Sequence, residues 1–310
     1  MKNLVMLDLG SNSTRMSINQ VDDRGNFREV KRMKQMTRMA EGMGAAEGGP
    51  KKLEEKAVER TLSALRDFQK EYQNMPNLTV RGIATEAVRS AENSLEFLEK
   101  VKELTGVDVE VLSGSAEAYY DYVGVINSLD VRDCVICDMG GGSFELVVVN
   151  GGEAVSYVSI PYGAVSLSEK FSAHDKISAQ DYFKFQRFIL YKFRQLPWLL
   201  QGQKLPLVLL GGASRTVARK ELMRLGRTDL EHIHGISMSS YSFLETYTEW
   251  LGMTCRERAD VLGPEASRAD IIIAGLTPIA LLVEYLQIPE IQFSESGVRE
   301  GVIYSMLKRQ

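Results

Sequence analysis

The chain reads Asp8-Leu9-Gly10-Ser11-Asn12-Ser13-Thr14-Arg15-Met16 near its start, and a related stretch, Asp138-Met139-Gly140-Gly141-Gly142-Ser143-Phe144-Glu145-Leu146, follows further along. Both share the pattern D-x-G-x-x-S, then a charged residue two positions later, then an apolar residue. An apolar run precedes each copy and alternating or β-branched residues follow it, which predicts strand, glycine-rich turn and strand. The aspartates lie 138 − 8 = 130 residues apart, close to one domain length. The repeat therefore predicts two lobes of similar plan, each opening with a β-hairpin.

Helical and strand-like patterns alternate along the rest of the chain, which predicts an α/β protein. Helices are expected over 52–72, 93–105, 116–126, 178–196, 239–251, 268–286 and 301–308, and strands over 78–84, 107–112, 153–160 and 205–210. Pro278 predicts a kink or break in its helix. The expected lobes are 1–124 and 125–299, with a terminal helix over 300–310 packing back on the first lobe. The segment 41–50 looks the most flexible.

The composition is that of a soluble globular protein, with 44% hydrophobic and 25% charged residues among 310. Lys+Arg 37 against Asp+Glu 41 gives a net charge of −4, so no basic excess drives binding to nucleic acid. The best apolar run, 271–283, is shorter than the ~20 residues a bilayer needs, and the N-terminus does not read as a signal peptide. We expect a cytoplasmic protein with no membrane or nucleic-acid partner.

The three cysteines do not form a disulfide framework. Cys134 and Cys137 make a C-x-x-C inside a predicted strand, where positions i and i+3 point to opposite faces. This geometry argues against a redox or zinc pair and favours two buried structural thiols.

The two turns are candidate phosphate sites, because glycine-rich turns expose backbone N–H groups that bind anions. One nest in each lobe would grip a polyphosphate across a cleft. The expected donors are the side chains of Asn12, Ser13 and Ser143 and the backbone of Gly140, Gly141 and Gly142. The alternative is a pair of ordinary tight turns, which the recurrence of the motif disfavours.

A metal site is expected at the same turns. Asp8 and Asp138 end their strands where a carboxylate can hold hydrated Mg²⁺, and Glu145 could share that ion. Hard oxygen ligands without Cys or His point to Mg²⁺ or Mn²⁺ rather than zinc.

Two further residues could take part in catalysis. Arg89 follows a strand and enters a helix, where it could clamp a phosphate, although an ion pair with a nearby glutamate is an equally natural role. Glu117 is expected in the exposed first turn of a helix, where the helix dipole favours the ionised carboxylate. It is a candidate general base for water, but spacing alone favours an ordinary first-turn glutamate.

The segments DLGSNSTRM, ATEAVRSAENS, VLSGSAEA, DMGGGSFEL, PYGAVSL, GGASRTVAR and GVREGVI together resemble the exopolyphosphatase and guanosine pentaphosphate phosphohydrolase family, from Leu7 to Ile303. The resemblance implies two ribonuclease-H-like lobes of the actin-like ATPase superfamily, with the active site in the cleft between them. It also implies the short form of the family, without a helical C-terminal extension, and a homodimer.

The resemblance implies specific roles at matching positions. Glu117 is the catalytic base, and Arg89 is a phosphate ligand. Asp138 and Glu145 serve Mg²⁺ and water, and the first loop contributes Asp8, Asn12 and Ser13. Three positions depart from the common pattern, namely Ala116, Phe144 and Ala213. None of them removes a required charge.

The implied activity is Mg²⁺-dependent hydrolysis of the terminal phosphoanhydride of inorganic polyphosphate, with release of orthophosphate. Guanosine pentaphosphate (pppGpp) losing its 5′-γ-phosphate is the main alternative substrate. A non-catalytic sensor of (p)ppGpp or polyphosphate would not need to keep the acidic residues. An ATP-dependent kinase would need an acceptor site, and no sugar-binding signature is present, although Gly211-Gly212 lies where the superfamily binds adenosine.

A local basic segment, 30–38, contains Lys31, Arg32, Lys34 and Arg38. It could line the route of a polyanionic substrate or form a solvated strand face.

Overall fold

The computed structural model describes residues 1–43 and 51–308. The chain divides into two compact units, Met1–Ala116 with Ser305–Gln310, and Glu117–Tyr304. The division therefore falls at 116/117 and not at the expected 124/125. The reason is that Ala118, Tyr122 and Val123 pack with strand residues of the second unit, such as Ile136. The segment 41–50 lies largely outside the described residues.

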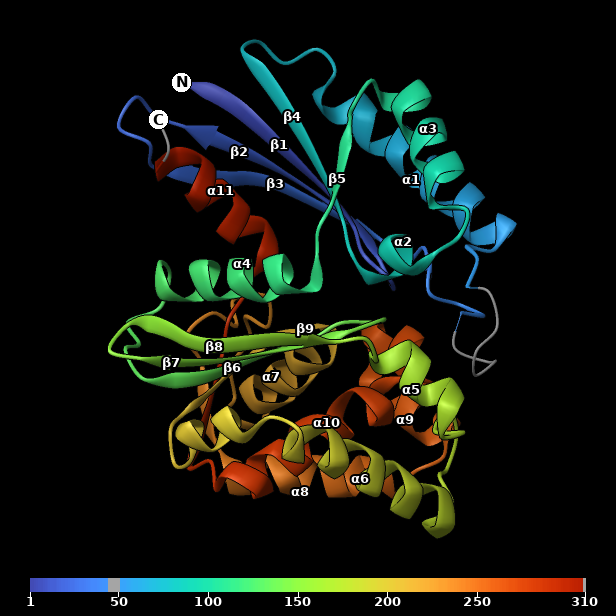
Figure 1. Ribbon diagram of the computed structural model, residues 1–310, viewed down its shortest axis with the longest axis vertical. Coiled ribbons are helices and arrows are strands. Elements are labelled where there is room, and N and C mark those ends of the chain that lie inside the picture. The colour runs from blue at the N-terminus through green and yellow to red at the C-terminus, as the bar shows by residue number, and fades with distance from the viewer. Residues whose placement is uncertain (44–50, 309–310) are drawn as a thin grey trace. The chain divides into compact units, whose positions relative to one another are not determined.

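The first unit is built on a five-stranded sheet in the order β3-β2-β1-β4-β5. Its strands are β1 (Lys2–Leu9), β2 (Thr14–Val21), β3 (Phe27–Gln35), β4 (Leu78–Ala84) and β5 (Val109–Val111). β2 runs antiparallel to β1 and β3, whereas β4 runs parallel to β1 and β5. Helices α1 (Glu55–Tyr72), α2 (Glu86–Ser90) and α3 (Ser94–Thr105) belong to this unit, and α1 lies beside α3 (Figure 1).

The second unit contains a six-stranded sheet in the order β10-β11-β9-β6-β7-β8. Its strands are β6 (Cys134–Met139), β7 (Phe144–Asn150), β8 (Glu153–Ile160), β9 (Leu207–Gly211), β10 (Ser237–Ser239) and β11 (Glu290–Phe293). Its α-helices are α5 (Ala164–Lys170), α6 (Ala179–Arg194), α7 (Gly212–Arg224), α8 (Ser240–Leu251), α9 (Cys255–Leu262) and α10 (Ile272–Leu286). The 3₁₀ segments are Pro197–Gly202 and Gly263–Arg268. Two helices, α4 (Gly114–Ile126) and α11 (Val298–Lys308), contain residues of both units.

The two sheets repeat one plan, which confirms the α/β class and the ribonuclease-H-like topology. Read as β8-β7-β6-β9-β11, the second sheet has the same order and strand directions as the first. The repeat extends to the turns: a Cβ added at Gly10 would lie 2.9 Å from the carbonyl oxygen of Ser13, and one at Gly140 would lie 2.9 Å from that of Ser143. Each copy thus needs glycine at the same place, because the chain folds back on itself there. The expected cleft between the lobes stays a prediction.

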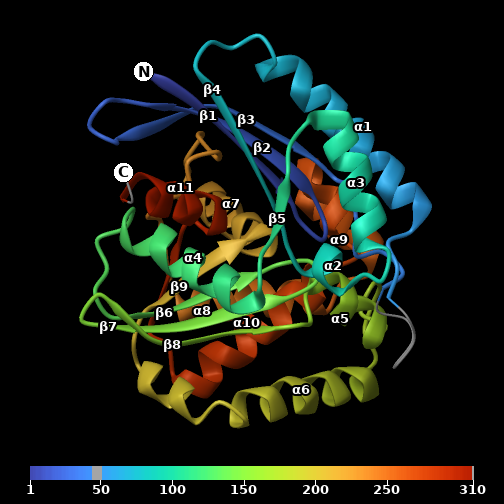
Figure 2. The ribbon, with the colours of Figure 1, turned by 45° about the horizontal axis from the view of Figure 1, so that its top comes forward.

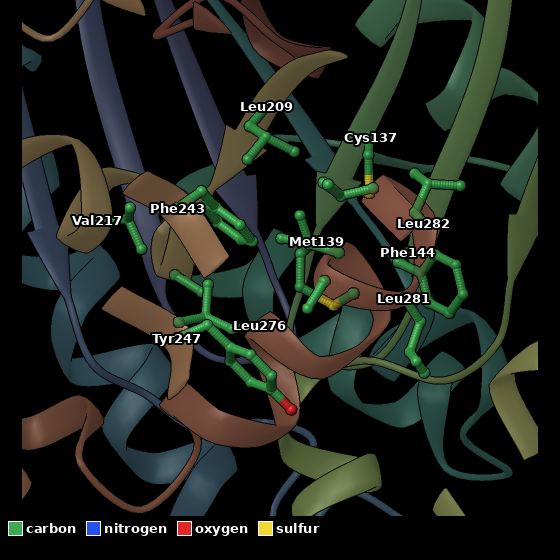
Figure 3. Close-up of a cluster of buried hydrophobic side chains, with 14 of the residues drawn as sticks. Cys137, Met139, Phe144, Leu209, Val217, Phe243, Tyr247, Leu276, Leu281 and Leu282 are labelled. Carbon is green, nitrogen blue, oxygen red and sulfur yellow. The ribbon is translucent and has the colours of Figure 1, made fainter. Parts of the chain in front are cut away.

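The main core of the second unit lies between its sheet and its helices (Figure 3). Cys137, Met139 and Phe144 of the β6–β7 hairpin belong to it, together with Leu276 and Leu282 of α10. Cys134 instead belongs to a second cluster beside α4. The two cysteines therefore face opposite sides of the sheet, as expected for a strand, and both thiols are buried.

Helix α10 is buried because its residues are apolar nearly all round (Figure 2 shows it among its neighbours). It continues through Pro278 up to Leu286, so the proline does not end it. No single helix among residues 1–43 and 51–308 is long and apolar enough to cross a membrane. One pair of helical segments would together be long and apolar enough, by length and composition only, namely Cys255–Arg268 with Ile272–Leu286. The two segments are bent by 96° relative to each other.

Candidate active site

Two carboxylates face each other across the β6–β7 hairpin. Asp138, near the end of β6, is the register partner of Glu145 near the start of β7. Directly opposed residues of an antiparallel pair point to the same face of the sheet. The expected proximity of these two side chains is therefore confirmed.

A third carboxylate, Asp121 of α4, joins them and was missed in the sequence. One ligand oxygen from each of Asp121, Asp138 and Glu145 lies within 4.8 Å of the other two. Asp121 is fully buried, and neither of its oxygens makes a hydrogen bond of normal geometry. The only signal was its spacing, because four residues after Glu117 places it on the same helical face.

Glu117 lies in the first turn of α4, as expected, but it is buried and not exposed. Ser113 caps this end of the helix, since its Oγ accepts a hydrogen bond from the backbone N–H of Ala116 at 3.1 Å. Glu117 contributes to the raised pKa of both Glu145 and Asp121. It therefore belongs to the cluster by its electrostatic effect, and the cluster then consists of four carboxylates of the second unit: Glu117, Asp121, Asp138 and Glu145.

Burial and mutual repulsion dominate the electrostatics of this cluster. Burial, followed by the charge of Glu117, raises the pKa of Glu145 well above its ordinary value. Burial, followed by the charge of Asp138, does the same to the pKa of Asp121. Hydrogen bonds that the hydroxyls of Ser143 (2.9 Å) and Ser159 (2.7 Å) donate to Glu145 Oε1 favour its ionised form. Such a set of oxygens could hold a hard divalent cation, which would offset the repulsion.

The second glycine turn is tied to the start of α5. The backbone N–H groups of Ala164 and Val165 donate to the carbonyls of Gly140 and Gly141, both at 2.9 Å. The N–H of Gly140 donates to the Ser143 carbonyl at 3.0 Å, inside the turn. Gly140 thus closes the turn with its N–H, and its role as a phosphate donor stays a prediction. The N–H groups of Gly141 and Gly142 stay the predicted donors, and Ser143 in this structure orients Glu145.

The first unit holds the other expected site residues around the first turn. Asp8 is the register partner of Arg15 near the end of β1, and Arg15 Nε donates to Ser13 Oγ at 3.2 Å. The backbone N–H of Ala87 in α2 donates to Ser11 Oγ at 3.2 Å, so α2 lies against this turn. The Oδ1 atom of Asn12 is buried without a hydrogen bond.

Arg89 of α2 forms an ion pair with a nearby glutamate, which was the alternative to a phosphate-binding role. Its guanidinium pairs with the buried Glu86 and also donates to the Leu112 carbonyl at 2.5 Å. These contacts fix the side chain at the end of β4, near the first turn. The role of Arg89 as a phosphate ligand stays a prediction. The role of Asp8 as a metal ligand also stays a prediction, because Asp8 lies in the first unit and the carboxylate cluster lies in the second.

Comparisons with known proteins agree with the motifs. The family model of the Ppx/GppA phosphatase family matches residues 5–310. A crystal structure of the Aquifex aeolicus member of that family is 28% identical, with a TM-score of 0.79, and the match covers 100% of this chain and 99% of that chain. An exopolyphosphatase from Cytophaga hutchinsonii shares the fold at 23% identity, with a TM-score of 0.89 and coverage of 99% and 98%. These matches confirm the resemblance found in the sequence.

Proposed function

This chain belongs to the Ppx/GppA phosphatase family, and from that premise we propose that it is an exopolyphosphatase. It would hydrolyse the terminal phosphoanhydride bond of inorganic polyphosphate and release orthophosphate. The observation that carries the proposal is the convergence of Glu117 with Asp121, Asp138 and Glu145 inside one compact unit. Phosphoanhydride hydrolysis needs a base for water and a counter-charge for phosphate oxygens, and this cluster can supply the base and hold the counter-charge.

Glu117 is the proposed general base. Its carboxylate would orient a water molecule and accept its proton as the oxygen attacks the terminal phosphorus. The helix α4 fixes its position, because buried residues that follow Glu117, such as Ala118 and Tyr122, hold that helix against the sheet. The leaving group is itself a phosphate anion, so no strong general acid is required.

Asp138 and Glu145 are the proposed ligands of Mg²⁺, or of Mn²⁺ in its place. The donor set fits a hard cation, since it is made of oxygens and contains no Cys or His. When bound, the ion would neutralise negative charge on the transferred phosphoryl group. Ser143 and Ser159 hold Glu145 in place for this role through their hydrogen bonds to Oε1. The N–H groups of Gly141 and Gly142 would contact phosphate oxygens.

A specific contact disfavours the kinase alternative. That activity would require a nucleoside site at Gly211-Gly212, at the start of α7. The guanidinium of Arg268 lies directly against Gly212, so that a Cβ at Gly212 would overlap it. Arg268 is itself largely buried and 3.7 Å from Glu265.

One assay tests the proposal against its alternatives. Phosphate release would be measured from polyphosphate, pppGpp and ATP, each with Mg²⁺ and with EDTA. We expect Mg²⁺-dependent release from polyphosphate. Phosphate release only from pppGpp would show that pppGpp, and not polyphosphate, is the substrate. Turnover of ATP that requires an added acceptor would indicate a kinase. Release from none of the three would indicate a sensor. Light scattering on the same sample tests the expected homodimer.

A further inference from the structure

Asp121 is a carboxylate of the cluster whose charge the surrounding protein does little to stabilise. Its side chain is fully buried, yet neither oxygen makes a hydrogen bond of normal geometry. The backbone N–H of Val298, at the start of α11, favours its ionised form but is outweighed by burial and by the neighbouring carboxylates. Among residues 1–43 and 51–308, no ion pair of Asp121 is found. Burying a carboxylate in this way is unfavourable unless a further positive group satisfies it.

The surroundings of Asp121 indicate which kind of positive group would stabilise its carboxylate. The side chains whose charge raises the pKa of Asp121 are Asp138, Glu145 and Glu117, all of them acidic. On the remaining side lies the backbone of Gly297, where a Cβ would come within 3.1 Å of Asp121 Oδ1. The ligand oxygens of Asp121, Asp138 and Glu145 lie within 4.8 Å of one another. A small, hard cation matches both the spacing and the charge.

We propose that Asp121 is a third protein ligand of the divalent cation assigned above to Asp138 and Glu145, so that this chain binds the ion before its substrate. The inference rests on the proposed metal-dependent hydrolysis but adds a ligand and a binding order to it. A site with two carboxylates relies on substrate phosphates to complete the coordination of Mg²⁺. A third carboxylate raises the affinity of the empty site. Asp121 also places the cation and the proposed base, Glu117, on one helical face of α4.

The direct test is metal binding without substrate. The full-length protein is stripped with EDTA and exchanged, and Mn²⁺ is titrated while free Mn²⁺ is measured by electron paramagnetic resonance. We expect Asp121→Asn to weaken Mn²⁺ binding by at least about tenfold. Glu221→Gln is the matched control, because Glu221 is a buried carboxylate of the same unit whose oxygens are held by Arg224. It should bind Mn²⁺ as wild type does. Equal affinity of wild type and Asp121→Asn would overturn the proposal.

Thermal unfolding separates a ligand from a structural residue. In EDTA, Asp121→Asn should unfold at the same temperature as wild type or higher, because like-charge repulsion is removed. With Mn²⁺, wild type should gain more in unfolding temperature than the variant, since bound metal stabilises the folded state by mass action. A variant that is less stable by the same amount in both buffers would show that Asp121 is only structural. Asp121→Ala provides the same comparison without a new amide group.

Failure of this inference differs from failure of the proposed function. Substrate-free Mn²⁺ binding that depends on Asp121, in a protein that releases no phosphate from polyphosphate, would leave the inference standing and remove the exopolyphosphatase proposal. Mg²⁺-dependent phosphate release together with Mn²⁺ binding that is unaffected by Asp121→Asn would do the opposite.

Discussion

Gly163 packs directly on Gly141, so that a Cβ at Gly163 would overlap the carbonyl group of Gly141. Gly163 precedes α5, and two N–H groups at the start of that helix bind the carbonyls of the second glycine turn. The turn is therefore shaped by its own sequence and also by a segment some twenty residues later. Any phosphate contact made by Gly141 and Gly142 depends on this packing.

The first prediction compares these two glycines. Gly163→Ala should lower the free energy of unfolding by about 1–3 kcal/mol, the usual cost of overpacking, and should also impair activity. Gly141→Ala should weaken polyphosphate binding more than stability, because Gly141 is half-buried and is not among the residues with positive φ. Urea unfolding and binding titrations measure the two effects. Normal polyphosphate binding by Gly141→Ala would mean that the second turn is not the phosphate cradle.

Glu117→Gln should lower kcat by roughly 10²–10⁴-fold, the usual scale for loss of a general base. Because Glu117 is buried beside Glu145, the change also removes one source of repulsion. The free energy of unfolding in metal-free buffer should consequently stay equal or rise. Steady-state kinetics and denaturant unfolding test both parts, and a variant with near-normal kcat would exclude Glu117 as the base.

Asp138→Asn should shift the Mg²⁺ dependence of activity to higher concentration and not merely lower its maximum. The reason is that Asp138 and Glu145 are opposed across the hairpin and would share one ion. Activity titrated with Mg²⁺ provides the measurement. Full wild-type activity in excess EDTA would contradict the metal assignment and would leave Arg89 and the backbone amides as the counter-charges.

The basic segment 30–38, which begins in β3 and extends past its end, should matter for long substrates if it lines their route. Lys31 pairs with Glu71, and Arg32 pairs with Glu29 at 2.8 Å, so part of its charge is offset. Replacing Lys31, Arg32, Lys34 and Arg38 together by glutamine should raise KM for long polyphosphate more than for short. Lys100→Gln with Lys102→Gln, on α3, is a control with the same kind of exposed pairs. Equal effects on both chain lengths would remove this segment from the substrate path.

The thiols should differ in reactivity. Burial raises the pKa of Cys134 to about 12 and that of Cys137 well above its ordinary value, so both stay protonated and enclosed at neutral pH. Cys255 is only half-buried. A colorimetric thiol reagent at pH 8 should therefore modify Cys255 first in the native protein and the other two only after unfolding. Rapid native modification of Cys134 would contradict the packing described.

Features that depend on neighbours in sequence could be predicted. The repeated D-x-G-x-x-S pattern predicted two hairpins, and the register of the second brings Asp138 opposite Glu145. Alternation along β6 predicted that Cys134 and Cys137 face different layers. A short turn fixes which residues of a hairpin pair with each other. The few residues on either side of the turn are therefore enough to predict that pairing.

Tertiary structure decided the rest. Asp121 and the burial of Glu117 follow from how α4 packs on the second sheet, a contact between segments that no local period specifies. Because of that packing, the two units divide at 116/117 and not at the expected 124/125. The sequence by itself thus determined which hairpins form and which of their side chains share a face. Only the packing of a helix against a sheet determined which carboxylates share one site, because burial and repulsion arise between residues that meet only in the folded chain.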